Sequence, residues 1–149
     1  MPDSGPILFA YDGSDLARAA IDEAGRQLST QRRAVAVTVW EPLGVNTFFP
    51  AGAIPVNEEV VEDLVKGAEE MAAEGAARAE AAGFQAEAVA TDGSPIWKRI
   101  VDVAQERKAS LVVLGSHGRT GLSWVMLGSV AGGVAQHFGG AVLIIHGRS

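Results

Sequence analysis

The sequence contains no cysteine, which excludes disulfide bonds, thiolate zinc sites and a cysteine nucleophile. Its three histidines, His117, His137 and His146, are too scattered along the chain to suggest a preassembled metal site. Basic residues are also scarce, because 12 lysines and arginines stand against 18 aspartates and glutamates, for a net charge of −6. This balance argues against broad binding to nucleic acid or to an anionic membrane surface.

Long apolar runs and targeting signals are missing as well. No run approaches the length of a membrane span, and the N-terminal stretch MPDSGPILFAYDGS has neither the basic region nor the apolar core of a signal peptide. We therefore expect a cytoplasmic protein with neither a membrane nor a nucleic-acid partner. The chain is long enough, at 149 residues, to bury one core, so we predict a single domain over residues 1–149.

Three common motifs are absent too. The chain has no G-x-x-x-x-G-K-[ST] phosphate loop, no G-x-G-x-x-G dinucleotide fingerprint and no G-x-S-x-G nucleophile elbow. No catalytic base, activated nucleophile or arginine clamp can be recognised either. We therefore predict no catalytic residues.

What the chain does have is a regular alternation of short apolar runs and longer amphipathic stretches. This pattern predicts strands at 7–10, 35–40, 85–90, 111–114 and 141–145, and helices at 15–28, 58–82, 95–108 and 129–138. Ser94 is the predicted N-cap of the third helix, with Pro95 at its first position. Residues 41–57 are rich in prolines and other breakers and predict a long loop. Because the strands are continuous apolar runs, we predict an α/β fold with a parallel sheet and helices on both faces.

Residues 115–129 read GSHGRTGLSWVMLGS and hold four glycines directly after an apolar strand. Glycine there serves either a tight turn or a backbone that an anionic ligand approaches closely. A second loop, Tyr11-Asp12-Gly13-Ser14, follows the first strand. Ligands of open α/β sheets lie outside the carboxyl ends of the strands, where the winding reverses. The two loops would face each other across that crevice if the first and fourth strands were neighbours.

The spacing Gly115-x2-Gly118-x9-Gly128-Ser129 resembles the nucleotide-binding signature of the universal stress protein family. The resemblance extends from the first strand, which ends in Asp-Gly-Ser, to the terminal Val-Leu-Ile-Ile strand. It implies a single open, doubly wound, five-stranded parallel sheet with strand order 3-2-1-4-5, which places the reversal between strands one and four. It also implies an adenine nucleotide as cofactor: ATP with Mg²⁺, or else AMP or another adenine nucleotide.

By position, the resemblance also implies which residues form the nucleotide site. Asp12 would meet the ribose hydroxyls or the magnesium ion carried by the phosphates, and the backbone around Val39 would contact adenine. Gly115 and Gly118 would let the chain pass beside ribose and phosphates. Gly128, Ser129 and Val130 would offer N–H groups at the start of the fourth helix, and Ser129 is a good helix N-cap in any case. The complete predicted set is Ala10, Tyr11, Asp12, Val39, Gly115, Gly118, Arg119, Gly128, Ser129 and Val130.

The chain departs from the family pattern at Ala131, where nucleotide-binding members often have serine or threonine. Losing one hydroxyl bond costs about 0.5–1.5 kcal/mol, so nucleotide affinity would fall several-fold without disappearing.

The last strand, 141–145, carries no lysine, proline or inward charge that would protect a sheet edge. Members of the resembled family commonly pair their last strands, so we expect a homodimer through residues 141–146. The leading hypothesis is a cytoplasmic, ATP-binding, stress-response protein that regulates an unidentified protein partner. Two alternatives stay open, a nucleotide-free dimeric interaction protein of the same fold and a slow ATP hydrolase that uses Asp12 to hold magnesium.

Overall fold

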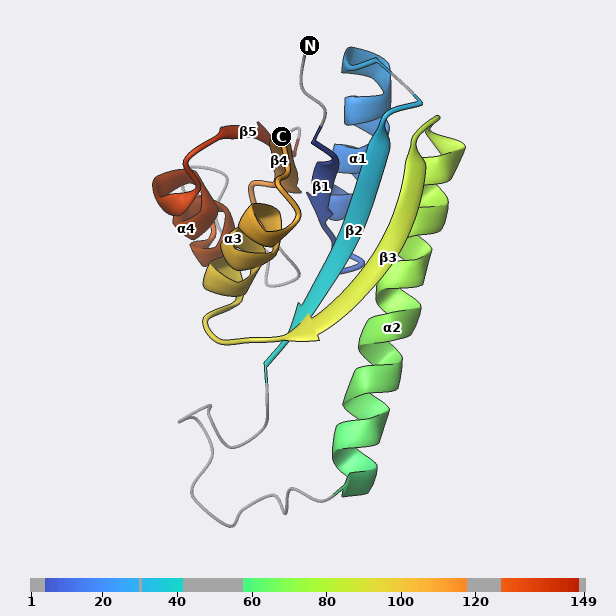
Figure 1. Cartoon of the computed structure of the whole chain (residues 1–149), viewed down its shortest axis with the longest axis vertical. Coiled ribbons are helices and arrows are strands. Elements are labelled where there is room, and N and C mark those ends of the chain that lie inside the picture. Colours follow the sequence, from blue (N-terminus) through green and yellow to red (C-terminus); the bar gives the residue numbers. More distant parts are fainter. Residues whose placement is uncertain (1–4, 30, 42–57, 118–126, 148–149) are drawn as a thin grey trace.

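The structure, a computed structural model, describes residues 5–29, 31–41, 58–117 and 127–147 (Figure 1). The predicted loop 41–57 therefore lies outside the described residues apart from Glu41. The elements are β1 (Ile7–Ala10), α1 (Asp15–Gln27), β2 (Arg33–Trp40), α2 (Glu58–Ala81), β3 (Gln85–Asp92), α3 (Ile96–Glu106), β4 (Leu111–Gly115), α4 (Ser129–His137) and β5 (Ala141–Ile145). Each predicted strand and helix is thus present, with its ends shifted by two residues or fewer.

The strands form one five-stranded sheet in the order β3-β2-β1-β4-β5. All of its pairings are parallel, and Phe9 of β1 lies opposite Ala36 of β2 on one side and Val113 of β4 on the other. The chain therefore winds outward from β1 to β3 and then crosses back to β4. The predicted strand order is confirmed, and the winding reverses between β1 and β4 as expected.

Helices cover both faces of the sheet, as predicted (Figure 1). Ile7 and Phe9 of β1 pack in a buried cluster with α1 and α2, and the Phe9 ring meets Phe84 edge-on with 5.5 Å between ring centroids. Leu8, whose side chain alternates to the other face, packs in a second cluster with α3 and α4. Within the described residues, no helix is long and apolar enough to cross a membrane.

The starts of α1 and α3 are capped differently. Ser14 caps α1, because its Oγ accepts a hydrogen bond from the N–H of Ala17 at 3.1 Å. The prediction that Ser94 caps α3 is wrong, since the N-cap is Pro95 and its side chain makes no capping bond. The hydroxyl of Ser94 instead donates to Oε2 of Glu41 at 2.9 Å. The helix begins at Ile96, one residue later than predicted.

β3 is two residues longer than its apolar pattern indicated. Thr91 and Asp92 continue the ladder because their partners on β2, Val39 and Trp40, extend equally far. Backbone pairing with an existing strand thus extended β3 into polar sequence.

Candidate functional site

The carboxyl ends of three neighbouring strands bring most of the predicted site residues to one edge of the sheet. β1 ends at Ala10, which lies opposite Val37 of β2, and Val39 follows two residues along β2. β4, on the other side of β1, ends at Gly115. The two loops that sequence analysis singled out, after β1 and after β4, therefore do leave the sheet side by side.

The turn after β1 presents Asp12 in a defined position. Its Oδ1 accepts a hydrogen bond from the N–H of Ser14 at 3.0 Å, and the intervening Gly13 has a positive φ of 79°. Asp12 does not cap α1, because Ser14 does. The carboxylate is held by its own turn, half-buried, at the point where β1 gives way to α1.

Tyr11 is bound into the fold by both its backbone and its side chain. Its N–H donates to the carbonyl of Val37 at 2.9 Å, and its own carbonyl accepts from Oγ1 of Thr38 at 2.8 Å. The side chain is buried in the layer of α1 and α2, where its hydroxyl donates to Oε1 of Glu74. Burial and the bond to the negatively charged Glu74 raise the pKa of Tyr11 to about 12. These contacts hold the chain after β1 against β2 and α2.

The glycine-rich loop returns to the sheet edge through a bond that sequence analysis did not foresee. Ser116 is buried, and its N–H donates to the carbonyl of Ile145 at 2.8 Å. Its carbonyl accepts from the N–H of Gly128, also at 2.8 Å. Because Gly128 is the N-cap of α4, this bond holds the start of α4 beside the end of β4. The N–H of Gly128, predicted to be offered to the phosphates, is thus already engaged within the protein.

The start of α4 has the features of an anion site. The prediction that Ser129 caps this helix is wrong, because the cap is Gly128, and within the described residues no side chain bonds to the first turn. The N–H of Gly132 makes the bond back to the carbonyl of Gly128 at 2.8 Å. The N–H groups that precede it, of Ser129, Val130 and Ala131, are donors that an α-helix leaves without internal partners. Such donors, together with the helix dipole, favour an anionic oxygen.

The glycine at 115 has a packing reason of its own. A Cβ there would lie 2.8 Å from Cγ of Leu16 on α1, closer than carbon atoms tolerate. Close packing between α1 and the end of β4 therefore demands glycine whether or not a ligand passes by. Gly118 and Arg119, two further residues of the predicted site, lie outside the described residues.

His117 adds a polar group that the predicted site did not include. Its Nδ1 lies 3.0 Å from Oγ of Ser116, whereas its Nε2 is buried and has no hydrogen-bond partner in the described part of the chain. Buried nitrogen atoms are rarely left unpaired, so this atom is available to a partner beyond the described residues. The available sequence signal was its place two residues beyond the end of a central strand.

Metal ligands do not gather at this edge. In the described ranges, no group of three or more His, Cys, Asp or Glu side chains could hold a metal ion. Asp12 is thus a single carboxylate, which by itself does not make a magnesium site.

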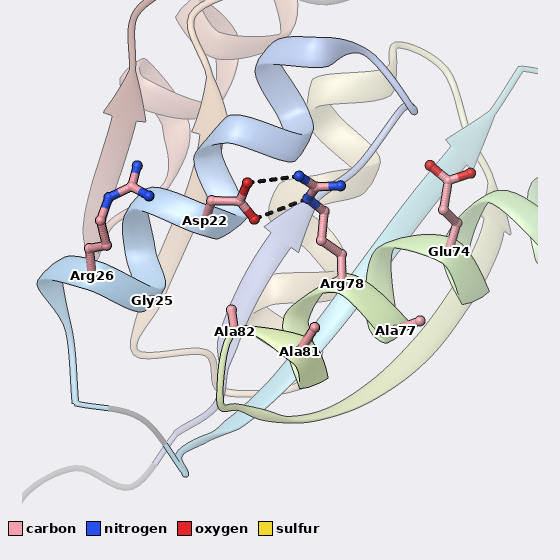
Figure 2. A pocket seen from close by; sticks show the side chains of 8 residues that line it. All are labelled: Asp22, Gly25, Arg26, Glu74, Ala77, Arg78, Ala81 and Ala82. Carbon is pink, nitrogen blue, oxygen red and sulfur yellow. Dashed lines mark hydrogen bonds and ion pairs between the residues drawn. The ribbon is translucent and has the colours of Figure 1, made fainter.

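An open groove of about 720 Å³ lies elsewhere, between α1 and α2 (Figure 2). Across it Arg78 of α2 makes two hydrogen bonds to Asp22 of α1, at 3.0 and 2.8 Å. The bond from Arg78 holds the pKa of Asp22 below its usual value. The groove is lined by Asp22, Gly25, Arg26, Glu74, Ala77, Arg78, Ala81 and Ala82. Its other two charged groups bond to residues outside the lining, Arg26 to Glu23 and Glu74 to Tyr11 and Arg18. All four charged groups of the groove thus have partners within the protein.

Comparison with known proteins gives a consistent result. The model of the universal stress protein family matches residues 4–146. Universal stress protein YxiE of Bacillus subtilis is 33% identical over 151 aligned residues, which cover 93% of this chain and 97% of that protein.

Solved structures share the fold. The hypothetical protein MJ0577 superposes with a TM-score of 0.78 at 22% identity, covering 98% of both chains. A universal stress protein in complex with cAMP has a TM-score of 0.63 at 26% identity, covering 97% of this chain and 98% of its own. An Archaeoglobus fulgidus universal stress protein in complex with dAMP has a TM-score of 0.57 at 22% identity, covering 95% and 97%. With a family model that spans nearly the whole sequence and a relative aligned over nearly its full length, the chain belongs to the universal stress protein family.

Proposed function

We propose that this protein binds an adenine nucleotide, in the first place ATP with Mg²⁺, in the crevice between the ends of β1 and β4. The observation that carries the proposal is the bond from the N–H of Gly128 to the carbonyl of Ser116. It supports an α4 whose free N–H groups open onto the same sheet edge as the Asp12 turn. An anionic group with a sugar beside it suits this combination of helix donors and one carboxylate.

The proposed contacts follow the order of parts in a nucleotide. The phosphates take the N–H groups of Ser129 and Val130, with Arg119 as a further cationic contact, and Gly128 contributes only its backbone position because its N–H already bonds to Ser116. Asp12 accepts from the ribose hydroxyls or bonds to the magnesium ion that the phosphates carry, which agrees with its being a single carboxylate. The backbones of Ala10, Tyr11 and Val39 flank the base, although the N–H and carbonyl of Tyr11 already serve β2. Gly115 and Gly118 leave room for the chain to pass beside the sugar and phosphates.

Two related proteins support an adenine nucleotide as the ligand. Universal stress proteins have been solved in complex with cAMP and with dAMP, each bearing one phosphate. The buried residue Ala131 supplies no hydroxyl to a phosphate in this chain. We therefore expect any difference in affinity between ATP and AMP to come from two sources alone, the N–H groups of α4 and the metal ion.

Calorimetry on the purified, nucleotide-free protein tests this function, with ATP and magnesium, AMP and cAMP as separate ligands. Binding of ATP should be lost or strongly weakened in Asp12→Ala and in Gly118→Ala. Gly132→Ala is the matched control, because a Cβ there meets no other atom within 4 Å. Absence of heat with every nucleotide for the wild-type protein would refute the proposal.

The proposal extends to a cytoplasmic regulatory homodimer that pairs β5 strands through residues 141–146 and responds to the bound nucleotide. Its support is that β5 is an outer strand with β4 as its neighbour in the sheet. An unprotected apolar edge of this kind pairs readily with another strand. Sedimentation with and without ATP should give a dimer mass, and a monomer at micromolar protein concentration would contradict it.

One observation favours a second candidate, a nucleotide-free dimer of the same fold. The contact between Leu16 and position 115 accounts for one signature glycine by packing alone. A protein that binds no nucleotide yet sediments as a dimer would support this alternative.

A further inference from the structure

The two residues that flank Asp12 are both held by α2. On one side, Tyr11 is only 3% exposed, and its hydroxyl donates to Oε1 of Glu74. The Tyr11 ring also lies so close to α2 that a Cβ at Gly75 would be 2.8 Å from its Cγ. Tyr11 is therefore fastened to α2 both by a polar bond and by ring packing.

On the other side of Asp12, Gly13 is covered by Met71. A Cβ at Gly13 would lie 2.5 Å from Sδ and 2.9 Å from Cε of Met71. Met71, Glu74 and Gly75 follow one another within about one turn of α2, so they present one face of the helix. That face contacts the residue before Asp12 and the residue after it.

Arg18 of α1 completes the arrangement. Its guanidinium lies 3.4 Å from Oε1 of Glu74 and 3.0 Å from Oδ1 of Asp15. The hydrogen bond from Tyr11, with the charge of Arg18 nearby, holds the pKa of Glu74 below its usual value, so this carboxylate stays ionised. Glu74 thus joins the end of β1, α1 and α2 at a single atom.

We infer that Glu74 and Met71 are positioning residues for Asp12: by holding Tyr11 and Gly13 against α2 they set where the Asp12 carboxylate meets a bound nucleotide. This inference rests on the proposed function. Neither Glu74 nor Met71 touches the nucleotide in the proposed complex, and both act through the backbone of the turn. Removing the Glu74 carboxylate should let the turn move and weaken the nucleotide contact that Asp12 makes.

The structure offers a matched control one turn further along both helices. Arg78 and Asp22 form an equivalent α1–α2 ion pair at 2.8 Å, as Figure 2 shows beside Glu74. Both pairs join the same two helices, but within the described ranges the Asp22–Arg78 pair makes no hydrogen bond to the end of β1. Arg78→Ala therefore reports the loss of a helix–helix ion pair without the loss of the Tyr11 anchor.

The test measures ATP affinity, in the presence of magnesium, and thermal stability for four variants. Glu74→Ala should weaken ATP binding by about three- to tenfold, within the range for residues that act on a ligand without touching it. Tyr11→Phe, which removes the same bond and keeps the ring, should do the same. Glu74→Gln keeps an acceptor for the tyrosine hydroxyl and should restore most of the affinity. Arg78→Ala should leave the ATP affinity unchanged, although its loss of stability should be comparable with that of Glu74→Ala.

A double-mutant cycle shows whether the effect passes through Asp12. In an Asp12→Asn background, Glu74→Ala should cause no further loss of ATP affinity. The inference is overturned if that loss persists in this background, or if Arg78→Ala weakens binding as much as Glu74→Ala. A wild-type protein that binds neither ATP nor AMP refutes the proposed function and this inference with it. If the wild-type protein binds ATP and Glu74→Ala binds it equally well, the inference alone is refuted and the proposed function stands.

Discussion

Two adjacent glycines in α4 should respond in opposite directions to the same substitution. At Gly132 an added Cβ meets nothing within 4 Å, whereas at Gly133 it would lie 2.2 Å from Cγ of Trp97 and 2.6 Å from Cδ1 and Cδ2. Trp97 of α3 is itself held there by stacking on His137, with 4.2 Å between ring centroids and 20° between ring planes. Gly132→Ala should therefore stabilise the protein, and Gly133→Ala should destabilise it.

The magnitude follows from two opposing effects on the free energy of unfolding. Alanine in a helix interior is more favourable than glycine by about 0.5–1 kcal/mol, and this gain applies to both positions. Carbon atoms pack at about 3.5–4.0 Å, so at Gly133 the indole or the helix must move by more than about 1 Å. Such overpacking costs about 1–3 kcal/mol. Because the propensity gain cancels, the two variants should differ in stability by about 1–3 kcal/mol.

Urea unfolding followed by far-ultraviolet circular dichroism measures this difference, together with melting temperature. Each kcal/mol corresponds to about 2–4 °C for a chain of this size. Equal stabilisation of both variants would refute the packing of Trp97 on Gly133. Equal destabilisation would refute the assignment of 129–137 as a helix with an open face at Gly132.

Three further predictions concern the region around the crevice and the groove. Tyr11 is the single tyrosine of the chain, so the tyrosinate absorbance should titrate with a midpoint of about 12 when folded and about 10 when unfolded. Because the pKa of Tyr11 is raised on folding, the contribution of this residue to stability is complete below about pH 10 and is lost as the pH rises towards 12. A folded-state midpoint near 10 would contradict the burial of Tyr11. Gly13→Ala, at a φ of 79° and against Met71, should cost more than about 1 kcal/mol in urea unfolding, and an unchanged midpoint would exclude this turn geometry. The lowered pKa of Asp22 makes its pair with Arg78 stabilising above about pH 4 and progressively less so as the pH falls, by about 0.2–1 kcal/mol for so exposed a pair. Arg78→Ala should therefore lose stability at neutral pH but little at acidic pH, as urea midpoints at the two conditions would show.

The local features of this fold could be predicted from the sequence because their causes lie within a few residues. Ser14 caps α1 through a bond to Ala17, three residues away, and the apolar runs that predict β1 and β4 are the strands themselves. Gly83, two residues past the end of α2, has a positive φ of 109°, a conformation that glycine adopts readily at helix ends. The strand order came from resemblance to a family, since alternating patterns alone do not say which strands are neighbours.

Only the tertiary structure showed what particular residues contact. The hydroxyl of Tyr11 and its acceptor, Glu74, are 63 positions apart, and no periodic pattern links them. Gly115, interpreted from the sequence as room for a ligand, also makes room for Leu16, and Ser116, which attracted no attention, holds the start of α4. Hydrophobic periodicity and helix capping depend on residues that are near one another in the sequence, so the sequence predicts them. Contacts between distant segments depend on how whole helices pack against the sheet, and they exist only once that packing has formed.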